Sequence, residues 1–379
     1  MTTGEQERVV VTGIGLVTPL GNDAGLVLRR IRAGASAAGP PTGFDAGAFA
    51  CPVCAQVEVF DPKLYVSEPK MVRLMNRDAQ LAVAAAHLAL EDAGVKPGPT
   101  YAPDDIALFG ATGLAGLPLR EVTPLICVSA APDGSFDLAR FGQSGLKVVS
   151  PILSFKILSN MPFCFVSINE SIQGPNAIYT PWEGEGAQAI EAGIRALQAG
   201  DARCALVGGC DVKTHELAFA SLQQHGLFSS WSKTSKGVVP AEGAAFLVLE
   251  IEKDALDRNA RRYGCLSAQR LRPQCDREDL FQTRLAGLRS LKIREVEVLV
   301  GAGNGDAGQE EQESAMLEAA EISVRTKLYP KKQVGDLFAA AGVLQVALGA
   351  ALTFAGAKTV LANCFGHGNT QAAFVLKRA

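Results

Sequence analysis

The segment GPNAIYTPWEGEGAQAI, residues 174–190, sets the fold of this chain. It opens with a turn at Gly174-Pro175-Asn176, continues through a short apolar run, and enters an alanine-rich helix. α/β proteins place reactive groups at such junctions, because the unpaired N–H groups of a helix N-terminus stabilise negative charge. The residue at the tip of this junction is Glu183. A carboxylate is a weak nucleophile, so Glu183 is a poor candidate for that role.

The composition limits the classes of function. The chain has 379 residues, of which 48% are hydrophobic, enough for two domains or one large duplicated domain. Its formal net charge of −3 provides no basic excess, and no apolar run reaches the roughly 18 residues of a spanning helix. We therefore expect neither nucleic acid nor a membrane as a partner. The nine scattered cysteines, without a secretion signal, predict reduced thiols in a cytoplasmic protein.

The predicted strands and helices alternate, and a similar order of elements occurs twice. The first half, residues 1–251, begins with the apolar strand Val9–Val17, and residues 252–379 form a shortened second half. Residues 34–67 and 114–150 are predicted insertions in the first half. This alternation predicts an α/β protein with mainly parallel sheets covered by helices, and it suggests an internal duplication. Long helices are predicted at Met71–Ala93 and Gly335–Phe354.

Two glycine-rich turns and one cysteine pair invite other interpretations. Residues 303–308, GNGDAG, match the GxGxxG fingerprint of dinucleotide-binding proteins, but the expected acidic residue about 20 positions on is missing. His367, in the second turn, could be a base, a donor or the wall of a pocket. The pair Cys51 and Cys54 lacks two further ligands at a zinc spacing. We predict no cofactor and no metal.

Short motifs follow one another over nearly the whole chain. They are RVVVTGIGLVTPLGN (8–22), VSP (149–151), NMP (160–162), GPN (174–176), AQAI (187–190), VGG (207–209), EG (242–243) and FGHG (365–368). In this order they resemble the β-ketoacyl synthases, the condensing enzymes of fatty-acid and polyketide synthesis. The resemblance implies a thiolase-like fold: a duplicated five-layer α/β/α/β/α architecture with mixed, mainly parallel sheets.

The resemblance also implies where catalytic groups should stand. Active members attack an acyl thioester with a cysteine, and two histidines stabilise the enolate that forms when malonyl-carrier protein loses CO₂. Here the cysteine position is Glu183, the first histidine position is Gly303 and the second is Asp336. The family lysine is kept as Lys331. A carboxylate in the following helix has three competing positions, Glu310, Glu311 and Glu313.

The three substitutions remove the chemistry together. Glu183 at a helix N-terminus should stay ionised and accepts an acyl group far less well than a thiolate. Gly303 has no side chain to donate a hydrogen bond, and an ionised Asp336 repels an enolate. Loss of one catalytic group leaves residual activity, whereas loss of all three removes the catalytic unit. We expect no condensation by this chain alone.

This pattern of losses is similar to that of the chain-length factor, or ketosynthase-β subunit, of type II polyketide synthases. There a copy without a nucleophile pairs with an active ketosynthase-α subunit, and the tunnel at their interface limits the growing chain. The resemblance implies a heterodimer with an active ketosynthase, and an acyl carrier protein met mainly through that partner. That branch commonly has glutamine where this chain has Glu183. Basic residues available for an acidic carrier protein are Lys63, Lys70, Arg73 and Arg77.

Alternatives remain for the residues and for the function. The resemblance makes Tyr179, Trp182, Glu183, Phe365 and His367 candidates for a pocket, tunnel or interface, and ordinary packing is the alternative for the aromatic residues. The family's gating aromatic position is His367, which indicates a pocket of altered size and polarity. The runner-up function is an acyl-thioester enzyme in which Glu183 acts as a base, assisted by His367 or Lys331. A nicotinamide-binding oxidoreductase is a third class.

Overall fold

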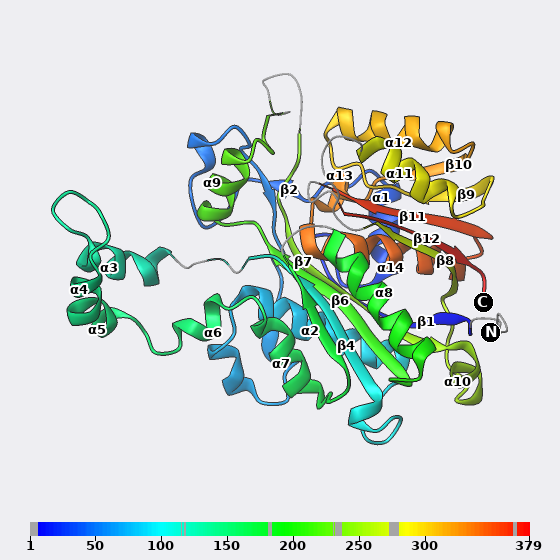
Figure 1. Ribbon diagram of the computed structural model, residues 1–379, viewed down its shortest axis with the longest axis horizontal. Coiled ribbons are helices and arrows are strands. Elements are labelled where there is room, and N and C mark those ends of the chain that lie inside the picture. The colour runs from blue at the N-terminus through cyan, green and yellow to red at the C-terminus, as the bar shows by residue number, and fades with distance from the viewer. Residues whose placement is uncertain are drawn as a thin grey trace.

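The computed structural model describes residues 7–114, 116, 119–180, 184–229, 231, 237–272, 280–366 and 370–379. Ten of its strands form one sheet in the order β10-β9-β11-β12-β8-β1-β7-β6-β4-β5 (Figure 1). The strands of the first half are β1 (Val9–Val17), β4 (Ile106–Thr112), β5 (Asn176–Tyr179), β6 (Cys204–Val212) and β7 (Glu242–Ile251). Those of the second half are β8 (Gly264–Arg272), β9 (Glu295–Val300), β10 (Ser323–Leu328), β11 (Thr359–Phe365) and β12 (Gln371–Lys377).

The strand order confirms the duplication. The five strands of each half can be numbered in chain order. Read from the outer edge of the sheet toward its centre, both halves then follow the same order: third, second, fourth, fifth and first. The two first strands, β1 and β8, pair antiparallel and join the halves, with Val9 opposite Leu266 and Val11 opposite Gly264. A division after residue 251 remains our proposal, and the repeated order supports it.

Helices cover both faces of each half-sheet and make five layers. Two helices, α8 (Gly184–Ala199) and α14 (Ala341–Phe354), lie between the half-sheets and share one hydrophobic cluster with both (Figure 1). A second cluster joins α2 (Arg77–Ala93) and α7 (Met161–Glu170) to the outer face of the first half-sheet. A third joins α11 (Leu280–Arg289) and α12 (Ala307–Ala319) to the second half-sheet. The expected α/β/α/β/α architecture is therefore present. The sheet is mixed as expected but not mainly parallel, because four of its strand pairs in the described residues are parallel and five are antiparallel.

The glycines of β1 explain why the opening motif needs its sequence. A Cβ on Gly13 would lie 2.3 Å from the carbonyl oxygen of Ala89, and one on Gly15 would lie 1.9 Å from that of Ala85. Both carbonyls belong to α2, which is rich in alanine along this side. The backbones of β1 and α2 therefore lie so close together that a side chain at position 13 or 15 would clash with the helix.

The two long helix predictions were too long at their N-terminal ends. The first helix begins at Arg77, with the Asn76 side chain accepting from the N–H of Ala79, and a 3₁₀ helix precedes it at Pro69–Arg73. The second helix, α14, begins at Ala341 instead of Gly335 and follows a 3₁₀ turn at Phe338–Ala340. A separate short helix, α13 (Lys331–Val334), ends just before Gly335, whose φ is +87°. Gly335 interrupts the helix because the next residue, Asp336, forms a β-bridge with Pro240.

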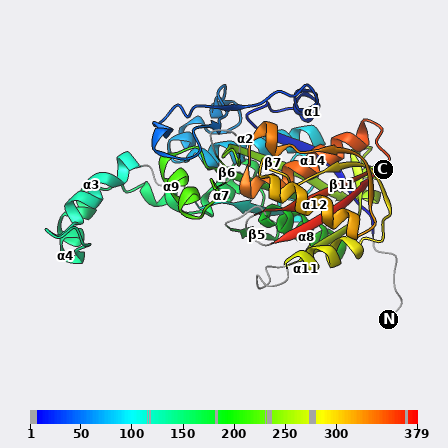
Figure 2. The ribbon, with the colours of Figure 1, turned by 90° about the horizontal axis from the view of Figure 1, so that it is seen from above.

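Most of the insertion predicted at 114–150 falls on a helical arm, residues 119–157, which projects away from the layers (Figures 1 and 2). Its root is held by an ion pair of 2.6 Å between Lys156 and Glu121 and by a hydrogen bond from Asn76 Nδ2 to the Lys156 carbonyl. Large apolar side chains on the arm stay exposed. The arm contains α3 (Leu119–Ser129), α4 (Leu138–Arg140), a π-helical turn at Phe141–Gly145, α5 (Leu146–Val148) and α6 (Leu153–Ile157).

The remaining described elements are short. Within the described ranges, no helix is long and apolar enough to cross a bilayer. The same ranges contain no group of three histidine, cysteine, aspartate or glutamate side chains placed to hold a metal ion. The short elements include α1 (Ala24–Arg32), β2 (Ala38–Gly39), β3 (Cys54–Ala55), α9 (Glu216–Gln224), α10 (Glu252–Asp257) and 3₁₀ turns at Ala46–Ala48, Pro62–Leu64 and Pro103–Asp105.

Candidate functional site

The candidate site surrounds the N-terminus of α8, where three distant segments converge. A Cβ on Gly184 would lie 2.2 Å from Cβ of Thr370, so the N-terminus of α8 touches a residue two positions after the closing FGHG motif. Cβ atoms on Gly186 and on Gly209 of β6 would each lie 2.6 Å from the carbonyl oxygen of Ala339. These glycines let α8, β6 and the turn before α14 meet. Glu183, Trp182 and His367 lie outside the described residues, so their predicted roles stay predictions.

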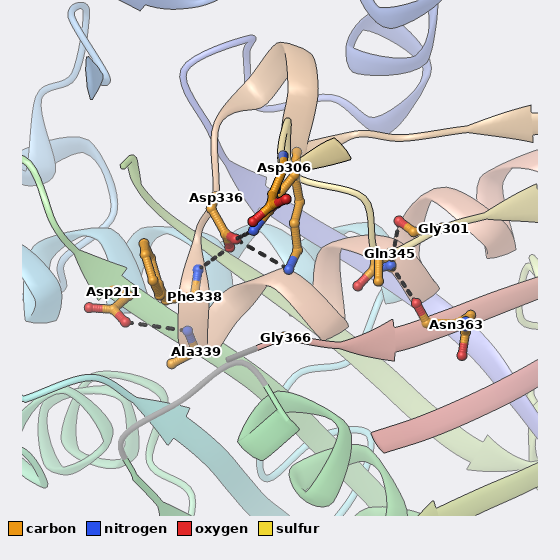
Figure 3. A network of polar contacts seen from close by, with 12 residues as sticks. Asp211, Gly301, Asp306, Asp336, Phe338, Ala339, Gln345, Asn363 and Gly366 are labelled. Atoms are coloured by element: carbon orange, nitrogen blue, oxygen red, sulfur yellow. Dashed lines mark hydrogen bonds and ion pairs between the residues drawn. The ribbon is translucent and has the colours of Figure 1, made fainter. Parts of the chain in front are cut away.

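Both carboxylate oxygens of Asp336 have polar partners in the protein interior. Its Oδ1 accepts from the backbone N–H of Phe338 at 3.0 Å, and its Oδ2 accepts from Asn304 Nδ2 at 3.2 Å (Figure 3). The same Oδ2 lies 3.3 Å from Nζ of Lys331, and both side chains are almost completely buried. Lys331 and Asp336, predicted to stand at the family lysine and at the second histidine position, therefore form a buried ion pair.

The space beside Gly303 is already occupied. A Cβ at this position would lie 2.5 Å from Cγ of Glu310 and 2.9 Å from Cδ1 of Tyr329. A histidine side chain does not fit there unless both neighbours move. The structure therefore brings Gly303 and Asp336, the two predicted histidine positions, close together through Asn304, and other side chains fill the space beside Gly303.

Glu313 is the buried carboxylate among the three candidates of α12. It accepts from the N–H of Ala302 at 3.2 Å and from Asn363 Nδ2 at 2.7 Å. Burial raises the pKa of its carboxyl to about 7, while the hydrogen bonds and the nearby charge of Lys331 act in the opposite direction. In contrast, Glu310 is half-exposed and pairs with Lys332 at 2.7 Å. Glu311 is exposed.

Buried amides lock the strands behind this carboxylate. Gln345 of α14 donates to the carbonyl oxygens of Gly301 at 2.8 Å and of Asn363 at 2.9 Å (Figure 3). Gln371 of β12 donates to Oδ1 of Asn363 at 3.2 Å. The ends of β9, β11 and β12 are thereby fixed relative to α14.

A second buried acid contacts the other side of the same turn. Asp211 accepts from the N–H of Ala339 at 3.3 Å and pairs with Lys213 at 2.5 Å (Figure 3). Burial raises its pKa, and burial together with the Asp211 charge raises the pKa of neighbouring Asp78 to about 7. Asp336 and Asp211 thus hold the turn at residues 338–339 from two sides.

Tyr179 and Phe365 occupy different environments. Tyr179 is half-buried on β5, the last strand of the sheet, opposite Ala111 of β4. Phe365 is 1% exposed within the third hydrophobic cluster, and the guanidinium of Arg284 lies 4.5 Å from its ring centroid. Arg284 also donates to the carbonyl of Gly366 at 3.3 Å, so it fixes the strand end that leads into the closing motif.

The comparison with protein families agrees with this geometry. Residues 6–255 match the family model described as beta-ketoacyl synthase, N-terminal domain. The chain belongs to the β-ketoacyl synthase family. It is 30% identical over 271 residues to 3-oxoacyl-[acyl-carrier-protein] synthase 2 of Coxiella burnetii, covering 69% of this chain and 62% of that protein. The synthase 2 of Synechocystis sp. is 29% identical over 275 residues, covering 70% and 62%. The chain therefore spans less than two thirds of the length of these relatives.

Solved structures extend the likeness to the whole fold. The ishigamide ketosynthase/chain length factor superimposes with a TM-score of 0.83 at 21% identity, covering 99% of this chain and all of that one. A β-ketoacyl synthase from Burkholderia phymatum superimposes with a TM-score of 0.79 at 19% identity, covering 98% of this chain and all of that one. At such low identity these matches establish the fold, which is the thiolase-like fold of the ketosynthases.

The structure also contains site residues that the sequence did not single out. Asn304 was considered only as part of a dinucleotide fingerprint, and instead its side chain holds Asp336. Neither Asp211 nor Tyr329 lies in a motif. One sequence signal could have selected Glu313 among the three glutamates, because this position falls on the buried side of α12 together with Met316 and Leu317.

Proposed function

We propose that this chain is a non-catalytic ketosynthase-like subunit, a chain-length factor. It pairs with an active ketosynthase in type II polyketide biosynthesis and shapes the tunnel through which the acyl chain grows. The observation that carries the proposal is the buried Lys331–Asp336 ion pair at the position of the second histidine. A carboxylate held by three partners cannot stabilise an enolate, because its own charge repels the charge that develops there.

The family frame supports this proposal because it is kept where chemistry is lost. The close approaches at Gly184, Gly186 and Gly209 keep the N-terminus of α8 packed against Thr370 and against the turn before α14. The space of the first histidine is taken by Glu310 and Tyr329. A scaffold that keeps its shape and loses its reactive groups is suited to binding and to forming a tunnel wall.

Two surfaces support a partner subunit. In the described part of the chain, β5 pairs with β4 alone, so its other edge presents backbone N–H and C=O groups that a second strand could pair with. The arm adds exposed apolar side chains, among them Phe136 at 67% and Leu138 at 72%. Exposed apolar groups of this size mark interaction surfaces. Two solved structures of similar fold are each named as a ketosynthase with a chain length factor.

The direct test is co-expression with a type II ketosynthase that keeps its cysteine and two histidines, taken from the same organism. We expect a stable heterodimer whose product has a defined length, and condensation that depends on the partner's cysteine. The variant Phe136→Asp with Leu138→Asp should abolish pairing, whereas Val59→Asp, at a residue 97% exposed outside the arm, should not. A partner that is soluble, active and makes products of unchanged length without this chain contradicts the proposal.

One substitution distinguishes the proposed subunit from the runner-up function, an acyl-thioester enzyme. If Glu183 acted as a base, Glu183→Gln would remove turnover on a small acyl thioester. A subunit with Glu183→Gln should support its partner as the wild type does. The measurement is product formation by the purified pair with each variant, with the partner alone as the baseline.

Carrier-protein contacts are expected mainly on the partner. Of the basic residues considered, Arg77 is not available, because it donates to Glu242 at 2.7 Å and to the Val57 carbonyl at 2.8 Å. Lys63, Lys70 and Arg73 are exposed and remain candidates for a weak contact with an acidic carrier protein.

A further inference from the structure

An apolar cavity of about 230 Å³ opens between α7 and the edge of the sheet. Its base is buried, with Leu108, Phe163 and Ile172 each at most 3% exposed. Its rim includes Ile168, which is 61% exposed, and the half-buried Cys164. The lining residues are Leu108, Phe163, Cys164, Ser167, Ile168, Ile172, Gly174, Asn176 and Ile178.

The packing of α7 explains why this space is open. A Cβ on Gly110 of β4 would lie 1.7 Å from the ring of Phe163, so the helix sits directly over β4. The last strand, β5, lies beyond it and is only partly covered. Along β5, Ala177 and Tyr179 pack on the central cluster, whereas Ile178 packs on the outer one and borders the cavity together with Asn176. The cavity therefore adjoins the unpaired edge of the sheet.

The surroundings indicate what should fill the cavity. A second strand added to β5 would carry side chains on alternating faces, and those on the α7 side would pass the mouth of the cavity. An apolar cavity of about 150 Å³ accepts a benzene-sized group, so this one has room for a large aliphatic or aromatic side chain. Anchors of this kind, buried in a pocket within a larger contact, carry much of the binding energy of interfaces.

We propose that this cavity receives one large apolar side chain of the partner subunit, from the strand that pairs with β5. The inference rests on the proposed function and deepens it, because it names the part of the surface on which affinity depends. Strand pairing supplies backbone hydrogen bonds and register, and the anchored side chain supplies most of the apolar burial next to them.

The first test fills the cavity from within. Cys164→Phe should place an aromatic ring in the space and weaken the affinity for the co-expressed ketosynthase at least about tenfold, by titration of purified subunits. The matched control is Ala355→Phe, which fills a different surface cavity of about 710 Å³ beside α1 and the end of α14. It should leave the affinity within about twofold of wild type. Thermal unfolding of each free variant checks that it is folded.

The second test uses the thiol of Cys164 itself, so it requires no cavity-filling substitution. In a Cys127→Ser, Cys275→Ser background, Cys164 should react with a maleimide in the free chain and at least about tenfold more slowly in the complex. Decanoic acid alone should give no protection. Protection by decanoic acid would assign the cavity to a small acyl ligand and overturn the inference.

The outcomes separate this inference from the proposed function. A wild-type heterodimer that forms equally well with Cys164→Phe overturns the anchor and leaves the heterodimer standing. Failure of the wild-type chain to bind the ketosynthase overturns both. Selective weakening by Cys164→Phe, with protection of Cys164 by the partner alone, supports the anchor.

Discussion

Replacing Asp336 by asparagine tests whether the former catalytic position has become a structural ion pair. The amide keeps the size and shape of the carboxylate but removes its charge, so buried Lys331 loses its carboxylate partner at 3.3 Å. Breaking a buried pair in this way typically costs about 3–5 kcal/mol of unfolding free energy. The entropy of unfolding is about 2.1 cal/mol/K per residue, so for 379 residues this loss corresponds to a fall in Tm of about 4–6 °C.

The assay is thermal unfolding followed by circular dichroism at pH 6. At that pH the neighbouring Glu313, whose pKa is raised to about 7, is largely protonated. It therefore supplies little negative charge to balance the charge of Lys331. The double variant Asp336→Asn with Lys331→Met should regain at least about 2 kcal/mol, because it leaves no buried charge.

A surface pair supplies the matched control. Glu321→Gln breaks the ion pair with Arg294, and both of these side chains are 74% exposed. It should change the unfolding free energy by less than about 1 kcal/mol. The reasoning is refuted if Asp336→Asn unfolds within about 1 °C of wild type, or if adding Lys331→Met brings no recovery.

Two further variants probe the same site. Gly303→His, which introduces the residue that the resemblance predicts there, should destabilise the chain by about 1–3 kcal/mol in thermal unfolding, because its Cβ meets Glu310 and Tyr329. Adding Glu310→Ala should recover part of this loss. Glu313→Gln should flatten the pH dependence of stability. The folded-state pKa of Glu313 is raised from 4.5 to about 7, so its protonated form contributes stability that is complete below pH 4.5 and is lost as the pH rises through 7. Between those values the wild type should lose up to roughly 3 kcal/mol more than Glu313→Gln.

A clear result would contradict each of the predictions for Gly303→His and Glu313→Gln. Wild-type stability for Gly303→His would mean that the space beside the glycine is open in solution. Parallel stability profiles for the wild type and Glu313→Gln between pH 4.5 and 7 would mean that this carboxyl titrates as an exposed one does.

Much of the fold could be predicted from the sequence, because its signals are local. The β1 motif requires glycine where strand and helix backbones touch, and the alternation of apolar strands with helices predicts the duplicated layers. Helix starts were less predictable. The Met71–Ala93 pattern continues smoothly through Asn76, yet the asparagine side chain caps the helix there. Helical periodicity records which face is buried and does not mark where the hydrogen bonding begins.

The losses predicted at Glu183, Gly303 and Asp336 rest on spacing along the chain, since a motif keeps its spacing after its reactive residue has changed. What replaced the lost groups is a matter of contacts between distant segments. Lys331 pairs with Asp336 because Gly335, at φ +87°, ends the short helix between them and turns the aspartate inward.

Other features of the site depend on packing over still longer separations. The choice of Glu313 among three glutamates depends on Asn363, 50 residues further along the chain. The cavity beside β5 exists because Phe163 packs over Gly110 and leaves the last strand uncovered. Local spacing was sufficient to predict a nucleophile turn and the positions of its missing groups. The burial, the partner of each charge and the open edge of the sheet arise from packing, because they depend on which segments meet in space.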